Sequence, residues 1–230
     1  MTDDNYIGVT TGTVATACSL AALDAIIDSD DIACVKVETP KKTLDIIIDE
    51  CKLLSSNKAI ARAHKNPYND PDVTVNLAII ATVELSDRVS EDSKVIITGG
   101  EGVGVITKPG LQIPVGEYAI NPVPRKMIVK NLEDKVPEGK VAKVTISIPE
   151  GVEIARKTMN PKLGIVGGIS VLGTTGIARS MSSDAYKNSI VTQIDVAIAS
   201  GIENRVLGKK GNDGGLRGVE IGTVVRVDEV

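Results

Sequence analysis

A glycine-rich segment, residues 160–177, constrains the fold of this chain more than any other stretch. It places five glycines among branched aliphatic residues and ends in Leu-Gly-Thr-Thr-Gly-Ile. Such a backbone can run beside a buried sheet and can turn where side chains would clash. Helical spacing follows, with Ser182 or Ser183 as the candidate N-cap and an apolar stripe that ends before Gly201. We therefore expect the glycines to join a buried strand to a helix.

The same glycines suggest a ligand site, because no side chains shield the backbone there. Exposed N–H groups, together with the hydroxyls of Ser170, Thr174 and Thr175, suit a carboxylate, a ribose or a phosphate. A tight loop needed only for packing explains the composition equally well, since glycine-rich turns are weak signals. A second cluster, residues 99–104, matches neither the dinucleotide-binding pattern nor a P-loop.

Composition and charge exclude several classes of protein. The chain has 230 residues, of which 42% are hydrophobic and 24% charged, as in one large or two small globular domains. It has no Phe and no Trp, so its core must be built from Ile, Val, Leu and Ala. A net charge of −4 without a basic patch or a stacking platform argues against a nucleic-acid partner. No apolar run of membrane-spanning length and no signal peptide are apparent, so we expect a cytoplasmic protein with no membrane partner.

Cysteine and histidine content limits the chemistry further. Cys18, Cys34 and Cys51 are odd in number and far apart, which fits neither a disulfide framework nor a zinc ligand set. We expect buried free thiols. His64 is the only histidine, which excludes a histidine-rich metal centre, and we predict no metal site in the protein.

Apolar periodicity predicts a mixed α/β chain. Small residues at helical spacing predict a helix over residues 14–26, and the threonines of residues 10–13 favour simple capping over anion binding. A boundary near residues 150–161 would separate a strand-rich α+β lobe, residues 1–150, from a smaller α/β lobe, residues 151–230. Short helices are expected at residues 121–132 and 149–158, and strands at residues 32–38, 44–48, 58–63, 73–85, 94–98, 141–148 and 219–227.

Two polar stretches carry charged side chains of interest. Asp70 and Asp72 share a face if their loop is extended, although a turn held by Asx hydrogen bonds needs the same residues. Arg125 falls in the first turn of the helix expected after Asn121, where its cation opposes the helix dipole. That placement favours a functional role, such as holding a carboxylate.

Four stretches of the chain occur in an order that is specific to one family. They are Thr10-Thr11-Gly12 with its alanine-rich helix, Asp70-Pro71-Asp72-Val73-Thr74, the second glycine cluster through Asn121-Pro122-Val123-Pro124-Arg125, and the segment from Asn160 to Gly176. In this combination the chain resembles the cobalt-precorrin-5B C(1)-methyltransferase family, or CbiD family. It departs from the family pattern at Asn66, where we expect aspartate, and at Ser180, where we expect proline. It is also shorter than family members, and its tail from Leu207 matches nothing.

The resemblance implies methyl transfer from S-adenosylmethionine to a ring carbon of a cobalt-containing tetrapyrrole, giving cobalt-precorrin-6A in anaerobic cobalamin biosynthesis. The cobalt would belong to the small-molecule substrate and not to the protein. The alternative is a catalytically inactive relative that binds a tetrapyrrole or a nucleotide. A third hypothesis, an unrelated α/β regulator that binds a nucleotide, is supported only by the two glycine clusters. Self-association into a homo-oligomer is compatible with the sequence.

The implied chemistry assigns roles to candidate residues. In-line attack on a sulfonium methyl group needs mainly positioning and exclusion of water. A carboxylate near the sulfonium, or one that takes a ring proton, would be Asp70, Asp72 or Glu101. The candidates for holding the acetate and propionate arms of the substrate are Lys65, Lys108, Asn121 and Arg125.

The methyl donor is assigned to the first glycine-rich segment, because nucleotides bind where a strand turns into a helix in open α/β sheets. The candidates there are Gly167, Gly168, Ser170, Gly173, Thr174 and Thr175.

Overall fold

The computed structural model describes residues 8–28, 32–67, 72–89, 93–178, 183–202, 205–209 and 219–223. The mixture of helices and strands confirms the predicted α/β fold class. The elements in chain order are β1 (Gly8–Val9), α1 (Thr11–Asp28), β2 (Cys34–Glu38), β3 (Thr43–Ile47), β4 (Glu50–Ser55), β5 (Lys58–His64), β6 (Ala78–Asp87), β7 (Val95–Gly99), β8 (Val105–Ile106), α2 (Pro122–Leu132), β9 (Lys140–Ser147), α3 (Gly151–Ala155), β10 (Ile165–Val166), β11 (Ile177–Ala178), α4 (Ser183–Ala199), β12 (Arg205–Lys209) and β13 (Val219–Thr223).

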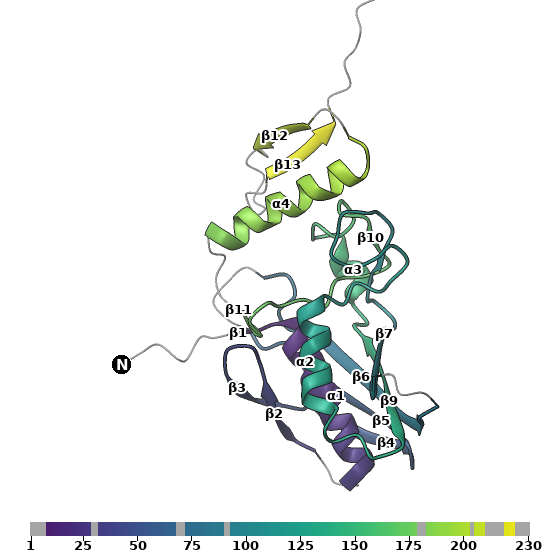
Figure 1. The fold of residues 1–230 in the computed structure, drawn as a ribbon. Helices are drawn as coiled ribbons and strands as arrows, with labels where there is room; N and C mark the ends of the chain where they lie inside the picture. Colours follow the sequence, from purple (N-terminus) through teal and green to yellow (C-terminus); the bar gives the residue numbers. More distant parts are fainter. Residues whose placement is uncertain are drawn as a thin grey trace, which may run out of the picture.

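A five-stranded sheet in the order β4-β5-β6-β9-β7 forms the centre of the larger part of the fold (Figure 1). Its pairs are antiparallel except β7 with β9, which is parallel. Alternate side chains are buried along β6, including Ile79, Ala81 and Val83, as expected of a sheet covered on one face. The predicted strand over residues 73–85 is wrong at its start, because residues 73–76 form a turn and β6 begins at Ala78.

Helix α1 covers one face of this sheet and is buried on nearly all sides (Figure 1). Its many small side chains allow close approach, and the Cys18 thiol donates a hydrogen bond to the carbonyl of Ile79 on β6. The β2–β3 hairpin and α2 pack against the same helix. The predicted helix and hairpin are thus confirmed. By length and composition α1 could cross a membrane, although the sequence analysis found no apolar run of that length. In the structure, however, 78% of the helix is buried inside the fold, as in the core helix of a globular protein.

The glycines of the two clusters allow three backbone segments to cross in contact. A Cβ atom on Gly168 would overlap the carbonyl of Gly102 and would lie 2.8 Å from the backbone nitrogen of Gly104. Gly102 has a φ of +70°, and its own Cβ would overlap the carbonyl of Ile148. Ile169 donates to the carbonyl of Gly102 at 3.0 Å, which fixes the crossing. Packing therefore explains why glycine stands at these positions.

The first glycine-rich segment pairs with strands and loops from earlier in the chain. Strand β10 pairs with β8, β11 pairs with β1, and single bridges join Val103 to Ile169 and Ile120 to Val171. The expected strand-to-helix loop is therefore wrong: Gly164 precedes β10, the other four glycines lie between β10 and β11, and α4 begins only at Ser183. The other N-cap candidate, Ser182, lies outside the described residues. The division into residues 1–150 and 151–230 stays a prediction.

The three cysteines are free thiols with different environments. Cys18 is buried, Cys51 is half-buried and Cys34 is exposed. The expectation of three buried thiols is wrong for Cys34, because the first residue of β2 points away from α1. Burial raises the pKa of the Cys18 thiol well above its usual range.

Candidate functional site

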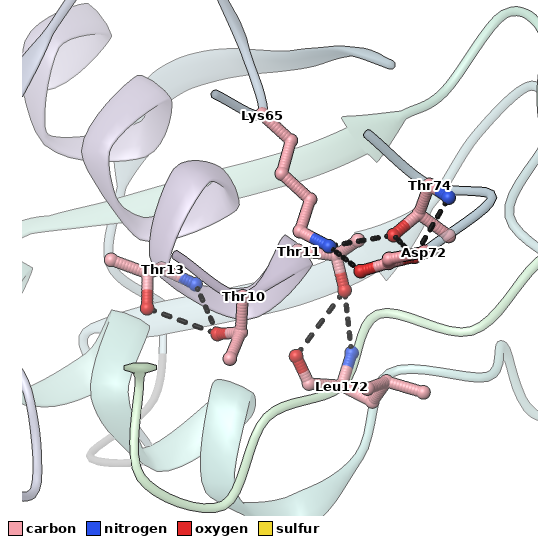
Figure 2. A network of polar contacts seen from close by, with 7 residues as sticks. All are labelled: Thr10, Thr11, Thr13, Lys65, Asp72, Thr74 and Leu172. Carbon is pink, nitrogen blue, oxygen red and sulfur yellow. Dashed lines mark hydrogen bonds and ion pairs between the residues drawn. The ribbon is translucent and has the colours of Figure 1, made fainter. Parts of the chain in front are cut away.

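The start of α1 is held by the distant glycine-rich segment. The Gly12 nitrogen donates to the Leu172 carbonyl at 3.0 Å, and the Thr13 hydroxyl donates to the Gly176 carbonyl at 2.6 Å. The Thr11 hydroxyl accepts from the Leu172 nitrogen at 3.0 Å and donates to its carbonyl at 3.2 Å (Figure 2). Residues 172–176 thus supply partners to a helix end whose first N–H groups lack intrahelical acceptors.

Thr10 is the N-cap of α1. Its hydroxyl accepts a hydrogen bond from the Thr13 nitrogen at 3.2 Å and lies 3.0 Å from the Thr13 hydroxyl (Figure 2). This geometry confirms the capping interpretation of the threonine stretch. Sequence reasoning noticed these threonines but not their partner Leu172, whose contact with Thr11 spans 161 residues.

A polar cluster of the buried Lys65 and the half-buried Asp72 and Thr74 lies at the same end of α1 (Figure 2). The Lys65 side chain, only 3% exposed, forms an ion pair with Asp72, and its Nζ donates to the Thr74 hydroxyl at 2.7 Å. The other Asp72 oxygen accepts from the Thr74 nitrogen at 2.8 Å and from the Thr74 hydroxyl at 2.6 Å. The bond to the Thr74 nitrogen is the Asx turn that was the alternative to a catalytic Asp72. Asp70 lies outside the described residues.

The cluster fixes the charge state of Asp72. Burial alone would raise the pKa of its carboxyl, but hydrogen bonds from Lys65 and Thr74 together outweigh burial and lower the pKa to about 2. Such a carboxylate stays ionised near neutral pH and is a weak proton acceptor. Lys65 was predicted to hold the acidic arms of the substrate and Asp72 to act as a catalytic carboxylate, but in the structure the two side chains form an ion pair with each other.

Arg125 and Asn121 lie at the start of α2. The Arg125 Nε donates to the Ile120 carbonyl at 2.9 Å and its Nη1 to the Ile97 carbonyl of β7 at 3.2 Å, while Nη2 lies 3.8 Å from Glu117. These bonds give Arg125 a structural task that the helix-dipole argument missed. The Asn121 nitrogen donates to the Val171 carbonyl at 3.0 Å, and its side chain makes no capping bond.

The remaining candidates divide into buried and exposed groups. Gly168 and Ser170 are buried, and Gly173 packs against the side chain of Thr10. The Thr175 hydroxyl bonds within its own turn, donating to the Ile177 carbonyl at 3.0 Å. Glu101, Lys108, Gly167 and Thr174 are exposed.

A mainly antiparallel sheet, a buried helix on one face and a glycine-rich segment that caps this helix define a mixed α/β protein with its polar cluster at the start of α1. Comparison with known proteins identifies the family. The CbiD family model matches residues 2–180. The chain belongs to the CbiD family.

Named relatives agree with this assignment. The cobalt-precorrin-5B C(1)-methyltransferase of Methanobrevibacter smithii is 79% identical over 206 residues, covering 90% of this chain and 57% of the relative. The protein of the same name from Methanosphaera stadtmanae is 54% identical over 198 residues, covering 86% of this chain and 51% of the relative. The chain therefore spans just over half the length of these curated relatives.

A solved structure supports the fold. The crystal structure of the cobalamin biosynthesis protein (cbiD) from Archaeoglobus fulgidus superposes with a TM-score of 0.56 at 30% identity, covering 81% of this chain and 58% of that chain.

Proposed function

We propose that this chain acts in the S-adenosylmethionine-dependent methylation of C-1 of cobalt-precorrin-5B, which gives cobalt-precorrin-6A in anaerobic cobalamin biosynthesis. The observation that carries the proposal is the 79% identity over 206 residues with a protein of that name. The comparisons give no support to a catalytically inactive relative. The reactants are small molecules, and cobalt enters with the substrate. We also propose a cytoplasmic location, in keeping with the core position of α1.

The methyl donor is assigned to the first glycine-rich segment. Gly167 has a φ of +82° and no atom within 4 Å of an added Cβ, so a ligand can approach its backbone closely. Thr174 offers an exposed hydroxyl. The structural support for contact with the methyl donor is weaker at Gly168 and Gly173, because packing against Gly102 and Thr10 already explains why these positions lack a side chain. Attachment of residues 172–176 to α1 would keep this surface rigid while the macrocycle carbon attacks in line.

The acidic arms of the substrate are assigned to cations and amides near this segment. The Lys108 ammonium is exposed, and its alkyl stem packs where Gly164 lacks a side chain. The Asn121 amide is not used for capping, and its backbone bonds the glycine-rich segment at Val171. Arg125 would contribute through Nη2, which lies 3.8 Å from Glu117, since Nε and Nη1 each donate to a backbone carbonyl. Asp70 and Glu101 remain the proposed carboxylates for contact with the sulfonium.

An anaerobic assay with methyl-labelled S-adenosylmethionine and cobalt-precorrin-5B tests the proposal. We expect mass spectrometry to show one labelled methyl group per macrocycle. A full-length relative serves as the positive control, because this chain spans only part of that length. Binding of both ligands without transfer, while the relative transfers, would favour the inactive-relative alternative for this chain.

A further inference from the structure

The turn at residues 72–77 is held by both the backbone and the side chain of Lys65. The Lys65 nitrogen donates to the Leu77 carbonyl at 3.0 Å, and the Asn76 nitrogen donates to the Lys65 carbonyl at 2.8 Å. The ammonium group adds its bonds to Asp72 and Thr74. One residue thus fixes the turn at both of its ends.

This turn is costly for a simple connection between β5 and β6. The ammonium group of a lysine side chain that is only 3% exposed must be stripped of water, and the ion pair offsets this cost only with good geometry and further hydrogen bonds. Asn76 has a φ of +62°, in the left-handed region that few residues other than glycine, asparagine and aspartate adopt. Antiparallel neighbours can be joined by two residues. Strained, over-determined conformations cluster at functional sites, which points to a task beyond chain reversal.

The location of the turn indicates that task. Lys65, Asp72 and Thr74 lie beside the first turn of α1, where Thr11 holds the backbone of Leu172 (Figure 2). Thr11 is itself 3% exposed, so its side chain has little room to move independently of its surroundings. Displacing the polar cluster would disturb the start of α1 and, through Thr11, the residues after Leu172.

We propose that Lys65 is a positioning residue of the methyl-donor site: its buried ammonium fixes the turn of Asp72 and Thr74 against the start of α1 and thereby fixes residues 172–174. This inference rests on the proposed function, which assigns the donor to residues 167–175. Lys65 acts through Asp72 and Thr11 and does not hold a substrate carboxylate itself. Its charge is matched by Asp72, which leaves the pair without net charge toward an acidic ligand.

The test compares Lys65→Met with Lys65→Arg in the full 230-residue chain. Lys58→Met is the matched control, because Lys58 begins β5, the strand that Lys65 directly follows, and its ion pair with Glu84 at 2.9 Å joins side chains that are 40% and 45% exposed. Two quantities are measured: hydrogen exchange of the Leu172 amide by NMR and the dissociation constant for S-adenosylmethionine by calorimetry. For Lys65→Met we expect both to rise about tenfold or more. Lys65→Arg should recover part of each, and Lys58→Met should stay within about twofold of the unmodified chain.

Two results would overturn the inference. One is a folded Lys65→Met chain whose Leu172 exchange and donor affinity match those of the Lys58→Met control. The other is equal loss in the methionine and arginine variants, which would indicate a packing role without a need for charge. If Lys65→Met does not fold, Thr74→Val replaces it, with an expected rise of about threefold or more in both quantities; unchanged values would again refute the inference. If the unmodified chain binds no S-adenosylmethionine, the proposed function fails, and exchange at Leu172 still decides on positioning.

Discussion

Two adjacent glycines, Gly167 and Gly168, should respond very differently to replacement by alanine. An alanine at Gly168 would drive its methyl group into the carbonyl of Gly102, and the three atoms nearest to that methyl group all belong to the backbone. An alanine at Gly167 would meet no atom within 4 Å, although its φ of +82° is unfavourable for an L-residue. Comparing the two variants therefore separates the free-energy cost of steric overlap at Gly168 from the cost of an unfavourable backbone conformation at Gly167.

The expected magnitudes follow from these contacts. Overpacking costs about 1–3 kcal/mol, and the crossing cannot relax without weakening the Ile169 and Gly104 hydrogen bonds, worth about 1 kcal/mol each. The Gly168→Ala change should thus lower the free energy of unfolding by about 3–5 kcal/mol. The left-handed conformation costs about 1–2 kcal/mol in Gly167→Ala, partly offset by reduced freedom of the unfolded chain. At roughly 2–4 °C per kcal/mol, the melting temperatures should fall by on the order of 10 °C and about 3 °C.

Urea and thermal unfolding followed by circular dichroism measure both variants. Donor affinity, measured in parallel, should fall mainly in Gly167→Ala if ligands approach the open side of the segment. Equal destabilisation of the two variants, or a larger effect in Gly167→Ala, would refute the packing explanation of Gly168.

Three further outcomes are expected. The pKa of Asp72, about 2 when folded against about 3.9 when unfolded, contributes stability above pH 4 that is lost as the pH falls toward 2. The free energy of unfolding, measured by urea denaturation, should therefore drop by about 1–2 kcal/mol more in the unmodified chain than in Asp72→Asn over that range, and parallel pH dependences would count against the ion pair. Arg125→Ala should lower the free energy of unfolding in urea by about 1–3 kcal/mol, because the guanidinium donates to two backbone carbonyls; loss of corrinoid affinity at unchanged stability would instead assign Arg125 to the substrate alone. A thiol reagent followed by mass spectrometry should modify Cys34 first and Cys18 only on unfolding, since burial raises the pKa of the Cys18 thiol.

Local patterns in the sequence predicted the elements whose signals are local. The small residues of α1 repeat at helical spacing, and the capping threonine lies directly before them. Strand β6 was predicted to begin too early because Val73 and Val75 continue its alternating pattern into the turn. The Asx bond from the Thr74 nitrogen to Asp72, which the sequence offered as an alternative, and the backbone bond from the Val75 nitrogen to the Asp72 carbonyl mark the turn before the strand.

The candidate site was less predictable because its decisive partners are distant or depend on burial. A glycine next to a ligand and a glycine next to another backbone look the same in one sequence, and the partner of Gly168 is 66 residues away at Gly102. Lys65 and Asp72 are close in sequence, but nothing local indicates that the lysine is buried. Assigning it to a substrate carboxylate assumed an exposed ammonium, which is the usual state of lysine.

The capping of α1 by residues 172–176 couples the candidate site to closure of the whole fold. These contacts join residues that are 160 to 163 apart in sequence, so they form only after a long loop has closed. Strands β5 and β6, by contrast, pair across a much shorter connection. Few bonds hold the segment compared with the central sheet, and such regions open at lower free energy than the core. We therefore expect the Leu172 amide to exchange through a partial opening, and the Val83 amide of β6 only on global unfolding. A saturating donor should slow exchange at Leu172 and leave Val83 limited by global stability; equal protection of the two amides in the free chain would show that the site and the sheet form one cooperative unit.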